Sequence, residues 1–342
     1  MWYAGWLVAE NRRYRIAPPT ARETAHPTDF QFSNIMETSE QANHRLYFGD
    51  NLDVLATLAQ EFEKTITLVY LDPPFFTKRQ HQHVSRAKKQ SGPPERLHQP
   101  AFDDRWDSFA DYLASIKARL KALKPLLAPH GSIVLHVDTR TSHYLKVIGD
   151  EIYGIDSFAS EIIWRYRRWP AKTQNFQRVH DVLLRWVADS HERPRFVQQY
   201  EELSPSTLKT WGKGKQRAVL DQNGRRLHTS IEPVESPGVP LGDVWDIPII
   251  APVARERTGY PTQKPEALLS LLIKSCTIEE DWILDPYVGS GTSIASAAKL
   301  GRKAIGIDSS PVAIETTRNR MKTNKIELFE CIGTNLHQQN PD

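Results

Sequence analysis

The stretch Leu68–Phe76, LVYLDPPFF, most restricts what this chain can fold into. Its apolar, strand-forming residues end at Asp72, and Pro73 and Pro74 cannot continue a sheet ladder because proline lacks the backbone N–H donor. The run therefore predicts a buried strand with a carboxylate at its C-terminal end. Ligands bind at that edge of open α/β sheets, so Asp72 is a candidate site residue. A solvated aspartate that merely ends a strand fits the same short motif, and the rest of the chain must distinguish the two.

Strand and helix patterns alternate over most of the chain. Short apolar runs that end at turns predict strands at 45–48, 66–71, 133–137, 162–164, 180–186, 282–284 and 304–307. Apolar residues at helical spacing predict helices at 52–62, 109–123, 142–153, 265–273, 295–300 and from 311 onward. This alternation favours an α/β fold with a central, mostly parallel sheet covered by helices on both faces.

The chain length allows one large α/β domain with insertions. Of the 342 residues, 39% are hydrophobic, which is enough for a packed core. Residues 1–43 lack periodicity and are expected to form a poorly ordered extension, with Met36 as a hypothetical translation start. The expected order is then a catalytic half at 44–188, a small inserted recognition lobe at 189–246, a cofactor half at 247–325 and a tail at 326–342. Within the catalytic half, the polar composition of 77–100 predicts a long loop that acts as a lid.

Cysteine and histidine usage argues against metal and disulfide classes. Cys276 and Cys331 are far apart and form no CxxC pair, as a zinc site or disulfide framework would require. Four histidines also lack metal-ligand spacing and are expected at the surface: His81, His83, His98 and His130. No metal is therefore predicted. No apolar run approaches the roughly 18 residues that a membrane helix needs, so no membrane partner is expected. The two isolated cysteines fit a reducing cytoplasm, which is the expected location.

Positive charge is concentrated in one segment. Residues 165–226 contain 14 Lys and Arg against six Asp and Glu, although the whole chain carries a formal net charge of only +3. Such asymmetry is typical of a surface that binds a polyanion, because Lys and Arg displace counterions from phosphates. An ordinary solvated surface is the alternative. The candidate phosphate contacts, in this segment and in the expected lid, are Lys78, Arg79, Arg165, Arg167, Arg168, Lys213 and Lys215.

A second motif, DPYVGSGT at 285–292, has the layout of a nucleoside-binding unit. A predicted strand leads into it, a helix and another strand follow, and Asp308 ends that strand 19 residues after Gly289. The glycines allow close approach of a ligand, and the acid accepts hydrogen bonds from ribose hydroxyls. A nicotinamide cofactor would need a third glycine where Ile294 stands. An adenosine cofactor without phosphates is therefore favoured, of which S-adenosylmethionine is the commonest.

Together, these motifs resemble the site-specific DNA amino-methyltransferases, in particular their circularly permuted beta group. The resemblance rests on four stretches in one order: Gly49-Asp50, DPPF at 72–75, TQKP at 262–265 and DPYVGSGT at 285–292. It covers residues 45–185 and 243–321. It implies a Rossmann-like S-adenosylmethionine-dependent methyltransferase fold that acts on double-stranded DNA, and so a protein associated with the prokaryotic nucleoid through DNA.

The resemblance also implies roles for individual residues. Asp72 and the backbone carbonyl of Pro73, followed by Pro74, would accept hydrogen bonds from an exocyclic amine. Phe75, where tyrosine is more common, would stack on a base that has been flipped out of the duplex. Methyl transfer would be direct, without a cysteine nucleophile. The residues that would hold the cofactor are Asp50, Lys264, Asp285, Pro286, Gly289, Ser290, Gly291, Thr292 and Asp308.

Asp rather than Ser at position 72 resembles the members that modify adenine, and predicts N6-adenine methylation. Transfer to N4 of cytosine is the alternative within the family. Two other classes are a DNA-binding protein on a methylase fold without catalysis, and a dehydrogenase, which Ile294 disfavours. A cognate restriction endonuclease and a homodimer are possible partners. The recognition sequence is not indicated by any motif, and no RNA-binding module is recognisable.

Overall fold

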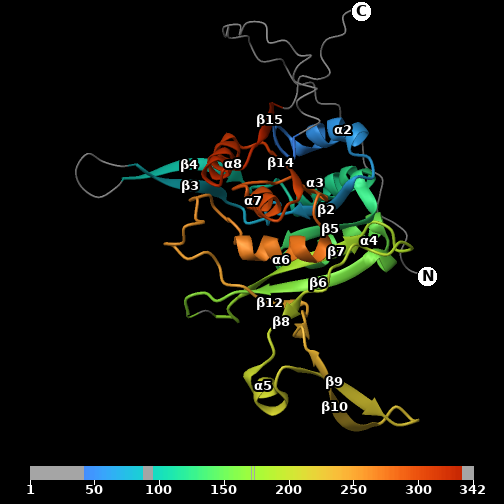
Figure 1. The fold of residues 1–342 in the computed structure, drawn as a ribbon. Coiled ribbons are helices and arrows are strands. Elements are labelled where there is room, and N and C mark those ends of the chain that lie inside the picture. The colour runs from blue at the N-terminus through green and yellow to red at the C-terminus, as the bar shows by residue number, and fades with distance from the viewer. Residues whose placement is uncertain (1–41, 88–94, 171, 173, 333–342) are drawn as a thin grey trace, which may run out of the picture. The chain divides into compact units, whose positions relative to one another are not determined.

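A sheet of nine strands carries the fold (Figure 1). The computed structural model describes residues 42–87, 95–170, 172 and 174–332. The strand order is β12-β6-β7-β5-β2-β13-β14-β1-β15. Every pairing in this sheet is parallel except those of β7, which runs antiparallel to β5 and β6. The strands are β1 His44–Phe48, β2 Ile66–Leu71, β5 Leu127–Val137, β6 Phe158–Arg165, β7 His180–Val187, β12 Val244–Asp246, β13 Trp282–Asp285, β14 Lys303–Asp308 and β15 Phe329–Ile332.

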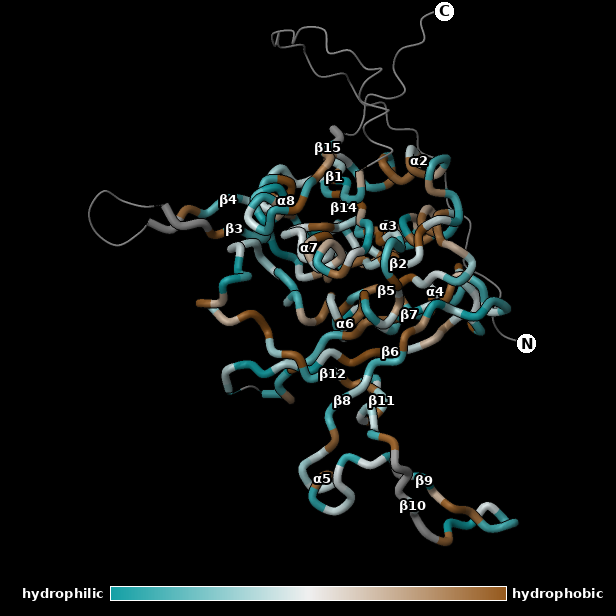
Figure 2. Tube along the Cα trace, in the orientation of Figure 1, coloured by the Kyte–Doolittle hydropathy of each residue, from teal (hydrophilic) through white to brown (hydrophobic). Residues whose placement is uncertain are grey.

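Helices cover both faces of this sheet, as the sequence predicts. On one face the buried core includes residues of α2 Asn51–Glu61, α3 Phe109–Leu123 and α4 Ser142–Tyr153. On the other it includes residues of α6 Glu266–Cys276, α7 Thr292–Lys299 and α8 Pro311–Thr323. The side chains of β2 alternate between the two cores, and all six residues of this strand are buried. A continuous apolar run is therefore what this central position requires. Figure 2 shows the apolar residues along the strands and their covering helices.

The middle of the sheet brings the two halves of the sequence together. Strand β2 pairs directly with β13, with Leu68 opposite Ile283 and Val69 opposite Leu284. From β2 the chain passes through α3 to β5 on one side, whereas from β13 it passes through α7 to β14 on the other. The connections diverge at this point, which creates a crevice at the carboxyl ends of β2 and β13. The two Asp-Pro motifs follow these two strands.

Three segments differ from the expected organisation. The predicted loop at 77–100 is wrong, because β3 Gln80–Ala87 and β4 Glu95–Asp103 pair as an antiparallel hairpin. Polar composition concealed these strands, since a hairpin is held by backbone hydrogen bonds that composition does not reveal. Strand β15 lies in the predicted tail and pairs with β1. Strand β12 belongs to the main sheet, so the predicted insertion extends a few residues too far.

The segment expected to form the recognition lobe has its own short elements. These are β8 Tyr200–Glu201, α5 Pro205–Trp211, β9 Gly214–Leu220, β10 Arg226–Glu235 and β11 Val239–Pro240. Strands β9 and β10 form an antiparallel hairpin, and β8 pairs with β11. Almost all of the predicted N-terminal extension lies outside the described residues. Among the described residues, no helix has the length and apolarity to cross a membrane.

Candidate active site

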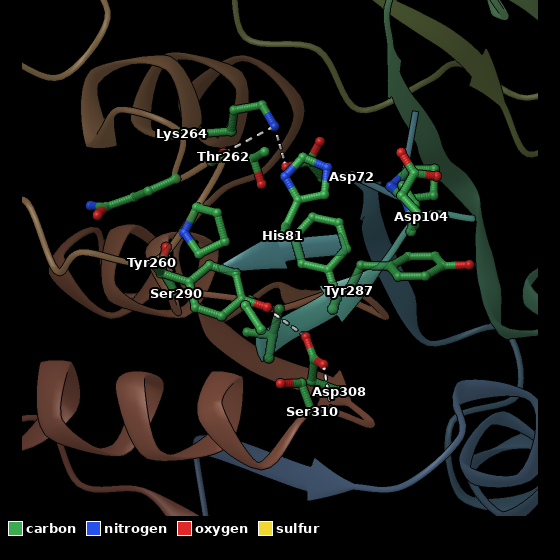
Figure 3. A pocket seen from close by; sticks show the side chains of 18 of the residues that line it. Asp72, His81, Asp104, Tyr260, Thr262, Lys264, Tyr287, Ser290, Asp308 and Ser310 are labelled. Atoms are coloured by element: carbon green, nitrogen blue, oxygen red, sulfur yellow. Dashed lines mark hydrogen bonds and ion pairs between the residues drawn. The ribbon is translucent and has the colours of Figure 1, made fainter. Parts of the chain in front are cut away.

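A cavity of about 540 Å³ opens at the carboxyl ends of β2, β13 and β14 (Figure 3). It lies where the crossover connections diverge. Ten of the predicted site residues line it: Asp72, Pro73, Pro74, Phe75, Lys264, Asp285, Gly289, Ser290, Thr292 and Asp308. The structure thus brings the catalytic and cofactor motifs into one space. Three predicted cofactor residues do not line the cavity: Asp50, Pro286 and Gly291.

Asp72 is held at the end of β2 by an ion pair with Lys264. The Lys264 Nζ donates to Oδ2 of Asp72 and also to the backbone carbonyl of Thr262, at 3.3 Å (Figure 3). Both side chains are largely buried, with 16% of Asp72 and 8% of Lys264 exposed. The same ammonium lies 5.0 Å from the centre of the Phe75 ring. One lysine therefore contacts both the carboxylate and the aromatic residue of the DPPF motif.

A buried histidine that the sequence analysis did not select lies behind Asp72. His136 is on β5, fully buried, with its Nδ1 2.8 Å from the hydroxyl of Tyr70 and 4.0 Å from Oδ1 of Asp72. Its Nε2 lies 3.6 Å from Oδ2 of Asp181 on β7. Burial raises the pKa of Tyr70 well above its ordinary value, so its hydroxyl stays protonated beside Nδ1. Its position near the carboxyl end of a strand beside β2 was the available signal.

Asp104 fixes the turn that follows the DPPF motif. This fully buried carboxylate accepts from the backbone N–H groups of Phe76 (3.0 Å) and Thr77 (2.6 Å). It also accepts from the Thr77 hydroxyl and from the Trp106 indole N–H, at 2.5 and 3.0 Å. Phe76 has φ +56°, a left-handed conformation that costs a non-glycine residue energy. Asp104 therefore holds the backbone beside Phe75 in a shape that it would not adopt alone.

The cofactor motif forms a tight turn beside two carboxyl groups, of which Asp285 is buried and Asp308 is half-buried. Gly289 N–H donates to Oδ2 of Asp308 at 2.9 Å, and Ser310 N–H donates to Oδ1 at 2.9 Å. Burial raises the pKa of Asp308 to about 6, although these N–H groups oppose the shift. Asp285 accepts from Tyr287 N–H at 2.9 Å, and burial raises its pKa to about 7. Asp308 is thus a hydrogen-bond acceptor on the lining of the cavity.

Glycine is required at the two turn positions of the motif. Gly289 has φ +50°, and a Cβ there would lie 3.1 Å from the Tyr260 ring. Gly291 has φ +73°, and a Cβ there would lie 2.8 Å from Cγ2 of Thr317. Side chains would therefore clash with the walls of the cavity at one position and with its support at the other.

Asp50 does not line the cavity, but it contacts Arg119, which does. Its carboxylate caps α2 by accepting from Leu52 N–H at 2.8 Å, and it pairs with Arg119 at 3.2 Å. Arg119 itself lines the cavity and also donates to Asn51 Oδ1 at 2.6 Å. The Asn51 amide donates to the carbonyl of Pro286 at 3.0 Å. Asp50 and Pro286 therefore meet through a network of side chains, and Arg119 is the member that faces the ligand space.

The β3–β4 hairpin contributes one wall. His81 lines the cavity and stacks on Phe102 with ring centres 4.5 Å apart. The expectation that His81 is a surface residue is wrong, because the hairpin folds against the site; burial lowers its pKa. Val84 N–H donates to the carbonyl of Gly259 at 3.1 Å, which connects the hairpin to the segment that carries Tyr260. The hairpin is therefore part of the site rather than a loop above it.

The predicted phosphate contacts are exposed and do not converge on the cavity. Arg165 pairs with Asp246, and Lys213 lies 3.5 Å from Glu235. The Lys78 ammonium lies 5.2 Å from the Phe76 ring centre. All seven candidates are at the surface: Lys78, Arg79, Arg165, Arg167, Arg168, Lys213 and Lys215. Their contact with DNA stays a prediction. Among the described residues, no cluster of His, Cys, Asp and Glu could hold a metal ion.

Comparison with known proteins places this site in a family. The family model N6_N4_Mtase, described as DNA methylase, matches residues 66–319. The type II methyltransferase M.EcaI of Enterobacter cloacae is 25% identical over 85% of this chain and 72% of its own length. The DNA adenine methyltransferase YhdJ of Escherichia coli K12 is 26% identical over 75% of this chain and 76% of its own. The chain therefore belongs to the DNA methylase family, as the motifs predicted.

Solved structures show the same fold. An M1.HpyAVI–SAM complex superposes with a TM-score of 0.50 at 17% identity, over 81% of this chain and 98% of that one. The cytosine-N4-specific PvuII DNA methyltransferase gives a TM-score of 0.51 at 15% identity, over 84% and 89%. The predicted α/β methyltransferase fold is thus confirmed.

Proposed function

We propose that this chain transfers a methyl group from S-adenosylmethionine to the N6 amine of a flipped-out adenine in double-stranded DNA. The observation that carries the proposal is the single cavity shared by Asp72, Phe75 and Asp308. An amine acceptor, a stacking ring and a ribose acceptor lie together there. The family supports a DNA amino group as the target.

The cofactor half of the cavity suits an adenosine with a charged sulfur. Asp308 is a half-buried acceptor for ribose hydroxyls on the cavity lining, and the turn at Gly289 leaves a space that a Cβ would fill. Arg119 and Lys264 are cations on the lining, either of which can hold a carboxylate. Bound there, S-adenosylmethionine supplies a methyl carbon that its sulfonium makes electrophilic.

The catalytic half prepares the amine. An exocyclic amine is a weak nucleophile because its lone pair is delocalised into the ring. Oδ1 of Asp72 and the carbonyl of Pro73 accept hydrogen bonds from the two N–H groups of the amine and direct its lone pair toward the methyl carbon. Lys264 holds Oδ2 of Asp72, which fixes the carboxylate without occupying the oxygen that faces His136. Phe75 stacks on the base.

Adenine rather than cytosine rests on Asp72 and on the relative named as an adenine methyltransferase. The cytosine-N4 alternative has a specific basis in the fold shared with the PvuII enzyme. The lobe with β9 and β10 would read the DNA sequence, and the seven exposed cations would contact phosphates. A cognate endonuclease and a homodimer are further expectations.

The test is single-molecule sequencing of DNA from cells that express the chain, beside cells that express Asp72→Ala. Methyladenine in one short motif with wild type, and none with the variant, is the expected result. Methylcytosine would keep the assignment as a DNA methyltransferase and show that cytosine, not adenine, is the target base. The exposed Asp103→Ala serves as a matched control in the same cavity wall and should keep the mark. Marks that persist in Asp72→Ala would refute the role of this carboxylate.

A further inference from the structure

Methyl transfer to the amine leaves a proton that must reach solvent. The N–CH₃ bond forms as the C–S bond breaks, the sulfur leaves as a neutral thioether, and the nitrogen becomes cationic until it releases one proton. The nearest base is Asp72, which is largely buried and paired with Lys264. A protonated Asp72 cannot accept a hydrogen bond from the next amine, so the proton must leave Asp72 before the next turnover.

We infer that His136 takes this proton from Asp72, and that Asp181 stabilises the resulting imidazolium and conducts the proton outward. This inference rests on the proposed function. His136 acts through Asp72 and does not contact the base, so it is a positioning and relay residue. The proton moves from the amine to Oδ1 of Asp72, then to His136, and finally to solvent past Asp181.

The geometry gives each step a short path. His136 Nδ1 is 4.0 Å from Oδ1 of Asp72, and Nε2 is 3.6 Å from Oδ2 of Asp181. The imidazole therefore lies between two carboxylates, one on each side of the ring. Its Nε2 is buried without a hydrogen-bond partner, so the Asp181 carboxylate is the nearest group that can pair with it.

Charges around the ring favour a transient imidazolium. The charged or titratable groups that face it are Tyr70 and Asp72 from β2 and Asp181 from β7, with Lys264 beyond Asp72. With both carboxylates ionised and the lysine charged, the group has one surplus negative charge. A proton on His136 neutralises it. The rings of Phe75 and Trp164 pack at 5.7 and 5.5 Å between ring centres and keep water from this side.

Asp181 connects the pair to the surface. Its side chain is 13% exposed, and its Oδ1 accepts from the hydroxyl of Tyr166 at 3.0 Å. Burial opposes ionisation of Asp181, but hydrogen bonds and charges from His136, Lys264 and Tyr166 outweigh it and lower its pKa. The exposed Arg168 donates to the Tyr166 hydroxyl at 3.2 Å. A continuous polar path therefore leads from Asp72 to solvent.

The competing explanation is a core histidine that merely satisfies Tyr70. The two explanations predict a different dependence of the methyl-transfer rate on pH. Transfer of tritiated methyl groups to whole-genome-amplified DNA, which carries no marks, is measured from acidic to alkaline pH. The variants are His136→Gln, Asp181→Asn and, as a matched control, the exposed His143→Gln on α4.

The expected result for His136→Gln is a turnover rate at least tenfold lower at neutral pH, with the Kd of S-adenosylmethionine at neutral pH within threefold. At S-adenosylmethionine concentrations that stay saturating over the whole pH range, the acidic limb of the profile is absent. Asp181→Asn retains the imidazole but removes the charge that stabilises its proton, so its acidic limb moves to lower pH. This variant keeps the inference testable if His136→Gln does not fold. His143→Gln keeps the wild-type profile.

Two outcomes overturn the inference and are distinguishable. If wild type transfers no methyl groups, the proposed function fails and the inference fails with it. If wild type is active and both variants keep the wild-type shape of the pH profile, only the relay is wrong and His136 is structural.

Discussion

Replacing Asp104 by asparagine is expected to release the turn that positions the DPPF motif. The carboxylate accepts four hydrogen bonds, two on each oxygen. An amide has one acceptor oxygen, so two buried donors lose their partner and face an N–H group instead. The fold around them stays otherwise the same, because the two side chains have nearly equal volume.

The magnitude follows from these four contacts. A hydrogen bond to a charged group contributes about 1.5–3 kcal/mol, so the loss of two costs roughly 3–6 kcal/mol. A domain has a total stability of about 5–15 kcal/mol. Phe76 also holds a left-handed conformation that costs about 1–3 kcal/mol, and the remaining bonds no longer secure it. A displacement of Phe75 by about 1 Å can lower a rate roughly 100-fold.

Three measurements test this expectation for Asp104→Asn. Urea unfolding should show the loss of stability, and single-turnover transfer of tritiated methyl groups should show the loss of rate. Calorimetry should show nearly unchanged affinity for S-adenosylmethionine, since Asp308 and Gly289 are untouched. The neighbouring Asp103 is exposed and bonds to Arg105, so Asp103→Asn should behave as wild type. Equal stability and rate for the two variants would refute the reasoning.

Three further predictions concern the cofactor turn. Because the pKa of Asp308 is about 6, affinity for S-adenosylmethionine should fall by up to about tenfold per pH unit below 6, and calorimetry on Asp308→Asn should show weaker binding without this dependence. The pKa of Asp285 is raised from 3.8 to about 7, so the native state binds the extra proton and its contribution to stability is lost as pH rises from about 4 to 7. Asp285→Asn should therefore stabilise the protein by up to roughly 4 kcal/mol at pH 8 and little at pH 4 in thermal unfolding; a gain independent of pH contradicts this. Gly291→Ala places a Cβ 2.8 Å from Thr317 at φ +73°, and should lower stability by about 1–3 kcal/mol and weaken cofactor binding in the same two assays.

The sequence was sufficient where a local pattern determines the structure. Strand β2 was predicted at its observed bounds, because a buried central strand needs a continuous apolar run and the prolines end it. Helix α4 and its Gly154 cap follow from periodicity and a glycine. The β3–β4 hairpin could not be found in this way. Its strands alternate polar residues on both faces, so no hydrophobic periodicity marks them.

The same division applies to the site. Asp72 and Asp308 were predicted because each ends a strand beside a recognisable turn. His136 and Asp104 were missed because their roles depend on contacts with residues more than 25 positions away, which no spacing rule connects. Asp50 was assigned to the cofactor through the family resemblance; in the structure its carboxylate caps α2 and pairs with Arg119, and its contact with a cofactor stays a prediction. Strand ends indicate where a site lies, whereas tertiary contacts decide which side chain faces it.

The pairing of β2 with β13 also sets the order in which the molecule can become active during its synthesis. The ribosome completes β2 about 215 residues before the strand that pairs with it. Until residues 282–285 emerge, one edge of β2 exposes unpaired N–H and C=O groups, and the nascent chain depends on protection from aggregation. A fragment released before that point carries Asp72 and the hairpin but has no place for a methyl donor. On the proposed function, a product that ends before residue 285 therefore could not methylate DNA.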